Sequence, residues 1–250
     1  MSDINDFVIE DGVLIEYEGN DSEVVIPESV TSIGDEAFGY CESITSLVIP
    51  DTVASIGAYA FGKCENLESV TIGNSVTSIE DGLFLECKNL KNIVIGNSVT
   101  SIGYEAFRFC TSLKSIEIPS GVTSIDDEAF FCCKGLESVT IPDSVTSIGV
   151  YAFNGCESLT SVVIPNVTDI GECAFYGCNG LTSIVIPNSV TSIGFEAFAS
   201  CTNLESVTIP DSVTSIDEAF KYCSNLVIST PAGSYAEEYA EENNIKVELI

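Results

Sequence analysis

The chain has 250 residues, 45% of them apolar, and its eight Lys and Arg stand against 38 Asp and Glu, for a net charge of -30. Such an anionic surface repels phosphate backbones and anionic lipid headgroups, so nucleic acid and membrane lipid are poor candidates as partners. There is no histidine, which removes imidazole metal ligands and the usual general base near neutral pH. No apolar run is long enough to cross a bilayer.

The N-terminal segment, DFVIEDGVLIEYEG, contains two alternating apolar runs around Asp11-Gly12. This pattern is a hairpin signal, and we expect residues 1–23 to form a β-hairpin cap. The first residues carry acids where a secretory signal would have a basic segment followed by an apolar one, so no signal peptide is predicted.

Internal repetition dominates the rest of the chain. A phenylalanine recurs in steps of 22 or 23 residues, at Phe38, Phe61, Phe84, Phe107, Phe130, Phe153, Phe175, Phe198 and Phe220. Residues 24–228 are therefore nine copies of one unit, which reads L-x-S-V-T-I-P-x-S-V-T-S-I-G-x-x-A-F-x-x-C-x-x. A unit of this size cannot bury its own apolar stripe, so the copies must stack into a solenoid. At about 4.8 Å per rung, nine rungs span roughly 43 Å.

Each unit changes its hydrophobic period along its length. Val70 and Ile72 alternate with Thr71 and predict a short parallel strand, closed by a turn such as Gly73-Asn74-Ser75. A second short extended piece follows. The Ala, Phe and Cys of each unit then lie three to four residues apart, which predicts a short helical turn. The expected class is therefore an α/β solenoid.

The C-terminal segment, residues 229–250, reads as a helix–strand cap. Ser234 and Glu237 form a capping-box pattern at the start of a helix, and Ile245, Val247 and Leu249 alternate as a last strand.

The repeat unit resembles a known family. L-x-x-V-x-I-P followed by V-T-S-I-G-x-x-A-F-x-x-C is similar to the BspA-type leucine-rich repeats of bacteria and some protists, over about residues 24–228. The resemblance implies a right-handed superhelix with a parallel sheet on its concave face. It also implies a cell-surface or extracellular protein used for adhesion to host or matrix proteins.

Eleven cysteines are the remaining side chains that could form disulfides, bind a metal or act in catalysis, and nine of them occupy one repeat column. We interpret these nine as structural thiols packed beneath the turn. Disulfides between rungs, or a metal or catalytic role, are the alternatives, although no C-x-x-C pair or histidine base accompanies them. Cys132 and Cys173 fall outside the column and are predicted to be the more exposed, reactive thiols. We expect no cofactor.

Function is expected where the copies differ from one another, and the columns flanking Ala-Phe vary most. They carry aromatic residues and one arginine, the side chains typical of interface cores. The candidate interface comprises Tyr40, Tyr59, Tyr104, Arg108, Phe109, Phe131, Tyr151, Tyr176, Phe195 and Tyr222. The alternative is that these rings lie flat over neighbouring rungs and complete the core.

Two further features are candidate sites. The outward strand column is nearly uncharged and β-branched, which suits a binding face or simply a strand: Val25, Val48, Thr71, Val94, Glu117, Thr140, Val163, Val185 and Thr208. Acids near the Ile-Gly turns suit a solvated acidic face or stacked calcium ligands, although no D-x-D-x-D-G loop appears.

These patterns predict a non-enzymatic, monomeric protein-binding or adhesion module that presents the sheet and the aromatic row to a protein partner. A structural spacer is the alternative. A thiol-dependent redox or metal-binding protein is a further alternative, which would need an exposed cysteine of low pKa.

Overall fold

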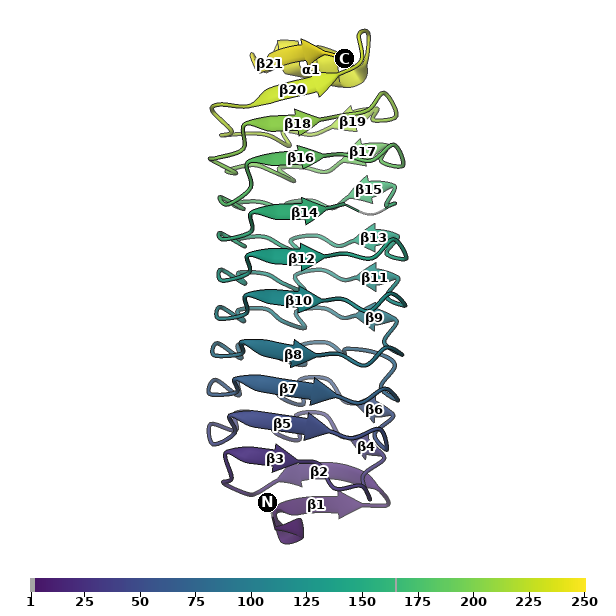
Figure 1. Cartoon of the computed structure of the whole chain (residues 1–250), viewed down its shortest axis with the longest axis vertical. Coiled ribbons are helices and arrows are strands. Elements are labelled where there is room, and N and C mark those ends of the chain that lie inside the picture. Colours follow the sequence, from purple (N-terminus) through teal and green to yellow (C-terminus); the bar gives the residue numbers. More distant parts are fainter. Residues whose placement is uncertain (1–2, 165) are drawn as a thin grey trace.

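The computed structural model describes residues 3–164 and 166–250, and it forms a solenoid of about ten turns (Figure 1). The predicted solenoid is confirmed. The chain climbs one rung per repeat, and equivalent residues of successive repeats lie one above the other. The short 3-10 helix η1 (Ile4–Asp6) and the strands β1 (Phe7–Glu10) and β2 (Val13–Tyr17) precede the first repeat.

One side of the column consists of parallel strands, most of them built from the Ser-Val-Thr segments, in three consecutive sheets of four, three and four strands that we together call the main sheet. Its strands are β3 (Glu23–Val25), β5 (Ser46–Ile49), β7 (Ser69–Ile72), β8 (Asn92–Val94), β10 (Ser115–Glu117), β12 (Ser138–Thr140), β14 (Ser161–Val163), β16 (Ser183–Val185), β18 (Ser206–Thr208), β20 (Val227–Thr230) and β21 (Lys246–Leu249). Pairing follows the repeat, so that Val70 of β7 lies opposite Leu47 of β5 and Ile93 of β8. Because side chains alternate, every second residue enters the core.

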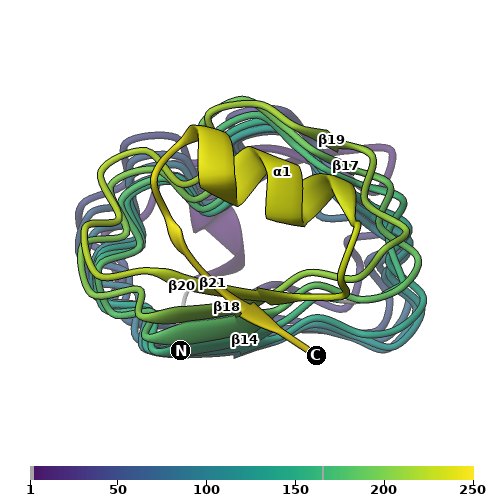
Figure 2. The ribbon, with the colours of Figure 1, turned by 90° about the horizontal axis from the view of Figure 1, so that it is seen from above.

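The Ser-Ile pairs that follow form the second sheet side of the column. Its strands are β4 (Ser32–Ile33), β6 (Ser55–Ile56), β9 (Ser101–Ile102), β11 (Ser124–Ile125), β13 (Ser147–Ile148), β15 (Asp169–Ile170), β17 (Ser192–Ile193) and β19 (Ser215–Ile216). This side has two parts: β4 and β6 extend the sheet of β1 and β2, and the other six strands form a six-stranded sheet. Ile79 joins this sheet through a single bridge to Ile102. Seen from above, the two sheets lie on different sides of a closed rung (Figure 2).

The Ala-Phe segment differs from the predicted helical turn. In all nine repeats the residues two before and two after the core phenylalanine have φ between 48° and 71°, the left-handed region. The amide groups of these two residues and of the phenylalanine donate to carbonyls of the next repeat. In the fourth repeat these bonds run from Glu105 to Asp127, from Phe107 to Ala129 and from Phe109 to Phe131, at 2.8–3.1 Å. The intervening amides close tight turns within the rung. The segment is therefore a third ladder between rungs rather than a helix.

The missing helix explains the shape of the column. In a solenoid with strands on one side and helices on the other, the helices are about 10 Å wide and the strands only about 4.8 Å apart, which forces curvature. Here the Ala-Phe segment, like the two sheet sides, is a ladder with strand-like spacing. The rungs accordingly stack in a nearly straight column, and the main sheet is close to flat rather than concave (Figures 1 and 2).

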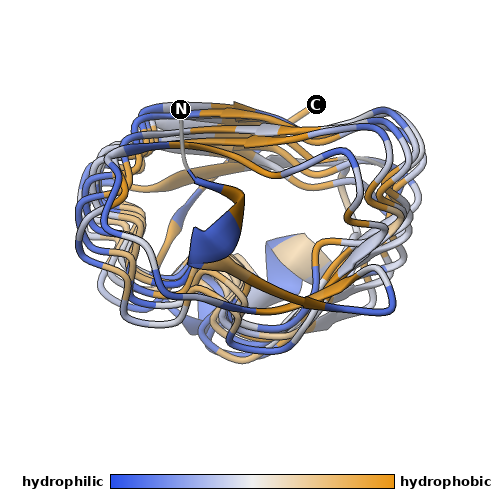
Figure 3. Cartoon of the chain, turned by 90° about the horizontal axis from the view of Figure 1, so that it is seen from below, coloured by the Kyte–Doolittle hydropathy of each residue, from blue (hydrophilic) through white to orange (hydrophobic). Residues whose placement is uncertain are grey.

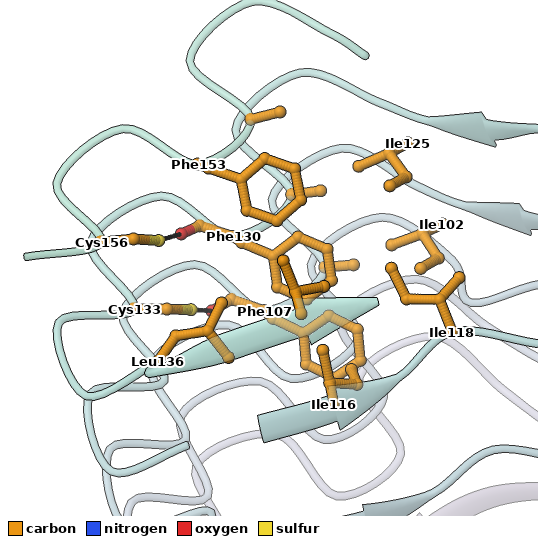
Figure 4. Packing of buried hydrophobic residues seen from close by; sticks show 14 of the residues in the cluster. Ile102, Phe107, Ile116, Ile118, Ile125, Phe130, Cys133, Leu136, Phe153 and Cys156 are labelled. Atoms are coloured by element: carbon orange, nitrogen blue, oxygen red, sulfur yellow. Dashed lines mark hydrogen bonds between the residues drawn. The ribbon is translucent and has the colours of Figure 1, made fainter. Parts of the chain in front are cut away.

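The core is built from vertical columns of identical residues. The nine repeat phenylalanines form one continuous stack, with neighbouring ring centroids 5.1–5.7 Å apart. Tyr17 continues the stack at the N-terminal end, 4.9 Å from Phe38, and Tyr239 meets Phe220 edge-on at 6.3 Å. Figure 4 shows three of these rings packed between isoleucines of the two sheets.

The repeat cysteines lie beside this stack and point into the backbone. From Cys64 to Cys223, each thiol donates to the carbonyl oxygen of the phenylalanine in the preceding repeat, at 3.1–3.3 Å (Figure 4). All eleven cysteines are free thiols. Cys41 has no repeat below it and is only half-buried, with its sulfur 3.2 Å from the Ser43 hydroxyl. The column therefore packs as small, weakly donating side chains.

Both ends of the stack are covered. β1 and β2 pair antiparallel and lie across the lower end (Figure 3), and β2 joins β4 in parallel. At the other end helix α1 (Tyr235–Glu242), capped by the Ser234 hydroxyl, lies across the opening (Figure 2), and β21 pairs in parallel with β20. The division into residues 1–23, 24–228 and 229–250 stays a prediction, and β20 continues across the second boundary.

Burial of the thiol column predicts a loss of stability at alkaline pH. Desolvation raises the pKa of Cys64 and Cys201 from 9.0 to about 12. Above about pH 9 the unfolded chain releases these protons while the folded chain retains them, so each thiol lowers the free energy of unfolding by up to about 1.4 kcal/mol per pH unit. Below that pH the thiols are protonated in both states and contribute no slope.

Urea unfolding at pH 7.5, 9 and 10 measures this effect. A variant with Cys110→Ala, Cys133→Ala and Cys156→Ala should be less stable at pH 7.5 but should show a shallower alkaline slope. A wild-type stability that stays constant from pH 8 to pH 10 would contradict the buried, protonated column.

Candidate functional site

All ten candidate residues lie on one surface, which we call the turn strip. It consists of the positions three before, two before, one after and two after each core phenylalanine. The residue directly before the phenylalanine, Ala in eight repeats and Leu83 in the third, is buried in every repeat. Because the backbone ladder is the same in all repeats, the strip positions can carry different side chains on one fixed frame.

The central part of the turn strip is a cation–aromatic cluster. The Arg108 guanidinium bonds to Glu105 at 2.5 Å and to Glu128 of the next repeat. The same guanidinium lies over the rings of Phe109 and Phe131, 5.0 and 4.7 Å from their centroids. These two rings meet edge-on at 5.7 Å and are half-buried. The structure thus unites three predicted residues in a partly desolvated group, and Tyr151 extends it, 6.4 Å from Phe131.

A second group forms around Tyr59 and Tyr104, two repeats apart. The Tyr59 ring lies across Gly82, where an added Cβ would come within 2.1 Å of it. Desolvation and the nearby charges of Glu105 and Asp81 raise the pKa of Tyr59. Desolvation and a hydrogen bond with Glu105 raise the pKa of Tyr104. The Asp81 carboxylate accepts the Tyr104 amide at 2.9 Å, so both tyrosines lie in a negatively charged environment.

Tyr40 lies toward the N-terminal end of the turn strip and is 66% exposed. Lys63 donates to its hydroxyl at 3.3 Å and lies 4.8 Å from the ring centroid. Together with Glu36, Tyr59 and Leu85, these residues line an open hollow of about 210 Å³.

The remaining candidates lie toward the C-terminal end. Tyr222 is 64% exposed, with Lys221 5.6 Å from its ring centroid. Phe195 is also exposed, whereas Tyr176 is half-buried. The ten residues therefore form several local groups along the column instead of one continuous aromatic row.

A C-terminal hollow of about 710 Å³ was not predicted from the sequence. It opens between the last repeat and the C-terminal segment, lined by Lys221, Tyr222 and Lys246 among others. The amide of Phe220, which has no further repeat to meet, bonds instead to the Tyr239 hydroxyl. In the sequence, this contact is signalled by the spacing of Ala236, Tyr239 and Ala240, which places Tyr239 on the buried face of α1.

The outward face of the main sheet carries an exposed valine ridge. Its members are 37–71% exposed, namely Val25, Val48, Val94, Val163 and Val185. Threonines and Glu117 interrupt the ridge, so its apolar residues form short groups on a nearly flat surface.

Basic side chains are paired along the repeat register. Four exposed lysines each bond to a glutamate one repeat away at 2.7–3.0 Å: Lys88 with Glu65, Lys91 with Glu68, Lys114 with Glu137 and Lys134 with Glu157. Exposed pairs of this kind contribute little stability each. Each pair nevertheless neutralises a lysine locally, so the charge that remains unpaired on the surface is mainly that of Asp and Glu.

The two cysteines outside the column differ from the prediction. Cys132 is half-buried, but Cys173 is buried, with 5% of its surface exposed. A hydrogen bond joins the Tyr151 hydroxyl to the Cys173 thiol, so the ring of the preceding repeat shields it. Desolvation raises the pKa of both thiols. The prediction of an exposed Cys173 was therefore wrong.

Comparison with known proteins identifies the repeat. The model of the BspA-type leucine-rich repeat region, which spans six copies, matches residues 16–137 and 123–236. The chain belongs to this family. Members of the BspA-type family are generally non-enzymatic repeat scaffolds. No curated protein is significantly similar in sequence to this BspA-type chain.

Several solved structures share the fold. A leucine-rich repeat protein from Bacteroides ovatus is 31% identical, with a TM-score of 0.71, over 98% of this chain and 76% of its own. The Treponema pallidum leucine-rich repeat protein is 28% identical, with a TM-score of 0.67, over 72% of this chain and 90% of its own. A leucine-rich cell surface protein from Faecalibacterium prausnitzii is 27% identical, with a TM-score of 0.50, over 94% of each chain.

Within residues 3–164 and 166–250, no group of three or more Cys, Asp or Glu side chains is placed to hold a metal ion. In the same ranges no helix has the length and apolarity needed to span a bilayer.

The burial of the cysteines predicts which thiols a reagent can reach: Cys41 and Cys132 are half-buried, and the other nine are buried. We expect a thiol reagent to modify Cys132 and Cys41 in the native protein at neutral pH, and the other nine only after unfolding. The double variant Cys41→Ser and Cys132→Ser should lose the fast reaction. Rapid modification of most of the eleven thiols would contradict the buried column.

Half-buried rings of the turn strip, such as Phe131, and exposed rings, such as Tyr222, should contribute differently to stability. Phe131→Asn, which introduces the residue found one repeat later at Asn154, should lower the free energy of unfolding by about 1–2 kcal/mol, because a half-buried ring is lost. Tyr222→Ser, which matches Ser200, should change it by less than about 0.5 kcal/mol. Urea denaturation measures both, and equal losses would mean that the exposed rings also serve the core.

Proposed function

We propose that this chain is a non-enzymatic protein-binding module of the adhesion type, whose turn strip contacts a protein partner. One observation carries the proposal. Tyr104, Phe195 and Tyr222 are exposed at positions where other repeats fold equally well with small or charged residues. The fold therefore does not require these rings, whereas exposed aromatic side chains are characteristic of interface hot spots.

The rigidity of the frame supports the proposal. Strip residues are held by amide bonds to the next repeat and by tight turns within their own rung. A surface that is ordered before binding loses little conformational entropy when a partner arrives. An individual rung could thus contribute contacts without any change of backbone.

Partner and location extend this proposal. One similar solved structure is described as a cell surface protein, and we place this chain in a comparable setting, with a host or matrix protein as its partner. Self-association is disfavoured because two copies would each carry a net charge of -30, so the proposed form is a monomer.

Other functions are less well supported by the geometry. A thiol enzyme or redox protein needs an accessible cysteine of low pKa, yet desolvation raises the pKa of Cys132 despite the opposing effects of Lys134 and Arg108. A structural spacer is compatible with a straight, rigid column. It differs from the proposal in predicting no selective partner.

Capture from a host-matrix extract tests the proposal. The immobilised wild-type chain is compared with a strip variant, Tyr104→Ala, Phe195→Val and Tyr222→Ser, in which each new residue occupies the same column in another repeat. A sheet variant, Val163→Thr and Val185→Thr, is the matched control. We expect at least a tenfold loss of retained protein from the strip variant, since removing hot-spot rings typically costs more than about 1 kcal/mol each.

The other outcomes separate the alternatives. Loss of capture by the sheet variant alone would move the site to the valine ridge and reject the turn strip. If the wild-type chain retains no more protein than an unrelated protein of equal negative charge, the spacer function is favoured.

A further inference from the structure

We infer that the turn strip recognises a basic polypeptide segment, whose arginine or lysine side chains are seated against Tyr59 and Tyr104 beside Asp81 and Glu105. This inference rests on the proposed protein-binding function and names the chemistry of the partner. It is argued from the protein's own cations, from the environment of the two tyrosines and from the distribution of charge.

The chain's own basic residues demonstrate the mode of binding. Three of its eight Lys and Arg lie against strip rings: Lys63 over Tyr40 at 4.8 Å, Arg108 over Phe131 at 4.7 Å and Lys221 over Tyr222 at 5.6 Å. Carboxylates accompany each cation. Glu105 and Glu128 bond to Arg108, Glu196 and Glu218 bond to Lys221, and Glu86 lies close enough to raise the pKa of Lys63. The strip thus repeatedly builds a cation site from a ring and a carboxylate.

Tyr59 and Tyr104 have neighbouring carboxylates but no cation stacked on the ring within the described ranges, and at Tyr104 the nearby Arg108 only partly opposes the rise in pKa. Each ring lies beside carboxylates, and these charges contribute to raising the pKa of both hydroxyls. Among the described residues, no Lys or Arg is stacked on either ring. Arg108 is engaged by Glu105 and Glu128, whereas no Lys or Arg in the described ranges pairs with Asp81. A guanidinium of a partner would therefore complete an arrangement that the protein uses elsewhere.

Charge complementarity favours the same occupant. The first 62 residues contain thirteen acids and no Lys or Arg, and most basic residues further along are paired with neighbours. A basic segment is attracted over long range and meets few opposing free cations, whereas an acidic partner or a second copy of this chain is repelled.

The spacing of the two rings sets the spacing of the ligand. Tyr59 and Tyr104 belong to repeats two rungs apart, roughly 9.6 Å along the column at 4.8 Å per rung. Three residues of an extended peptide span about 10 Å. The probe is therefore a capped heptapeptide, Arg-Ser-Gly-Arg-Ser-Gly-Arg, and its matched control has glutamine in place of each arginine.

The full chain is titrated with both peptides at 150 mM salt by calorimetry. The tyrosine variant, Tyr59→Gly and Tyr104→Ala, takes its residues from Gly82 and Ala58 of the same columns and leaves the net charge unchanged. The charge control, Glu238→Gln, Glu241→Gln and Glu242→Gln, removes three acids from α1, away from the strip. Urea unfolding confirms that each variant is folded.

We expect the arginine peptide to bind the wild-type chain. Its affinity should be at least fivefold lower for the tyrosine variant and within twofold of wild type for the charge control. The glutamine peptide should not bind. Tyrosine ring signals in NMR provide a readout without mutation, since those of Tyr59 and Tyr104 should shift on binding while that of Tyr235 on α1 should not. Equal affinity for wild type and tyrosine variant, an equal loss in the charge control, or preference for an acidic peptide or heparin would overturn the inference.

Failure of the inference is distinguishable from failure of the proposed function. If the turn-strip substitutions abolish capture from the extract but the arginine peptide does not bind, the protein-binding function stands and the basic partner is rejected. If the extract experiment assigns capture to the valine ridge, both fall together.

Discussion

In every repeat, the residues two before and two after the core phenylalanine adopt the left-handed backbone conformation. The rest of the structure depends on this conformation. Fifteen of these eighteen residues are not glycine, although the left-handed conformation costs an ordinary residue about 1–2 kcal/mol. The cost is offset because the conformation turns three amides per repeat toward carbonyls of the next one and buries the phenylalanine in a continuous stack. A helix at this place would be about twice as wide as a strand spacing and would bend the column.

The same constraint creates a surface that is free to vary. Since the backbone conformation is imposed by the ladders between rungs, the position two before the phenylalanine accepts Glu36, Tyr59, Gly82 and Cys173 alike. Side chains there are presented on a frame that does not need to reorganise, which is a favourable property for binding. Stability resides in the repeated columns, so the strip positions can vary without loss of the fold.

Electrostatics follows the repeat as well. Lysine and glutamate meet one rung apart because equivalent positions stack, so most of the few cations are neutralised within the molecule. The surplus acids keep a largely apolar column dispersed in water. An aromatic ring beside a carboxylate favours a cation. Arg108 fills one such position, and at Tyr59 the position has no stacked Lys or Arg among the described residues.

The sequence by itself determined the repeat, the inward columns and the solenoid, because residues such as Phe107 and Cys110 recur at one spacing and must share one environment. It did not determine the conformation around them. Apolar residues three to four apart suit a helical turn and a series of tight turns equally well, and only hydrogen bonding between rungs decided for the latter. The burial of Cys173 under Tyr151, and the division of the ten candidate residues into local groups, also depended on the tertiary structure. A side chain on the turn strip contacts residues 22 or 23 positions away, and the identity of that neighbour, rather than of its own repeat, sets its exposure.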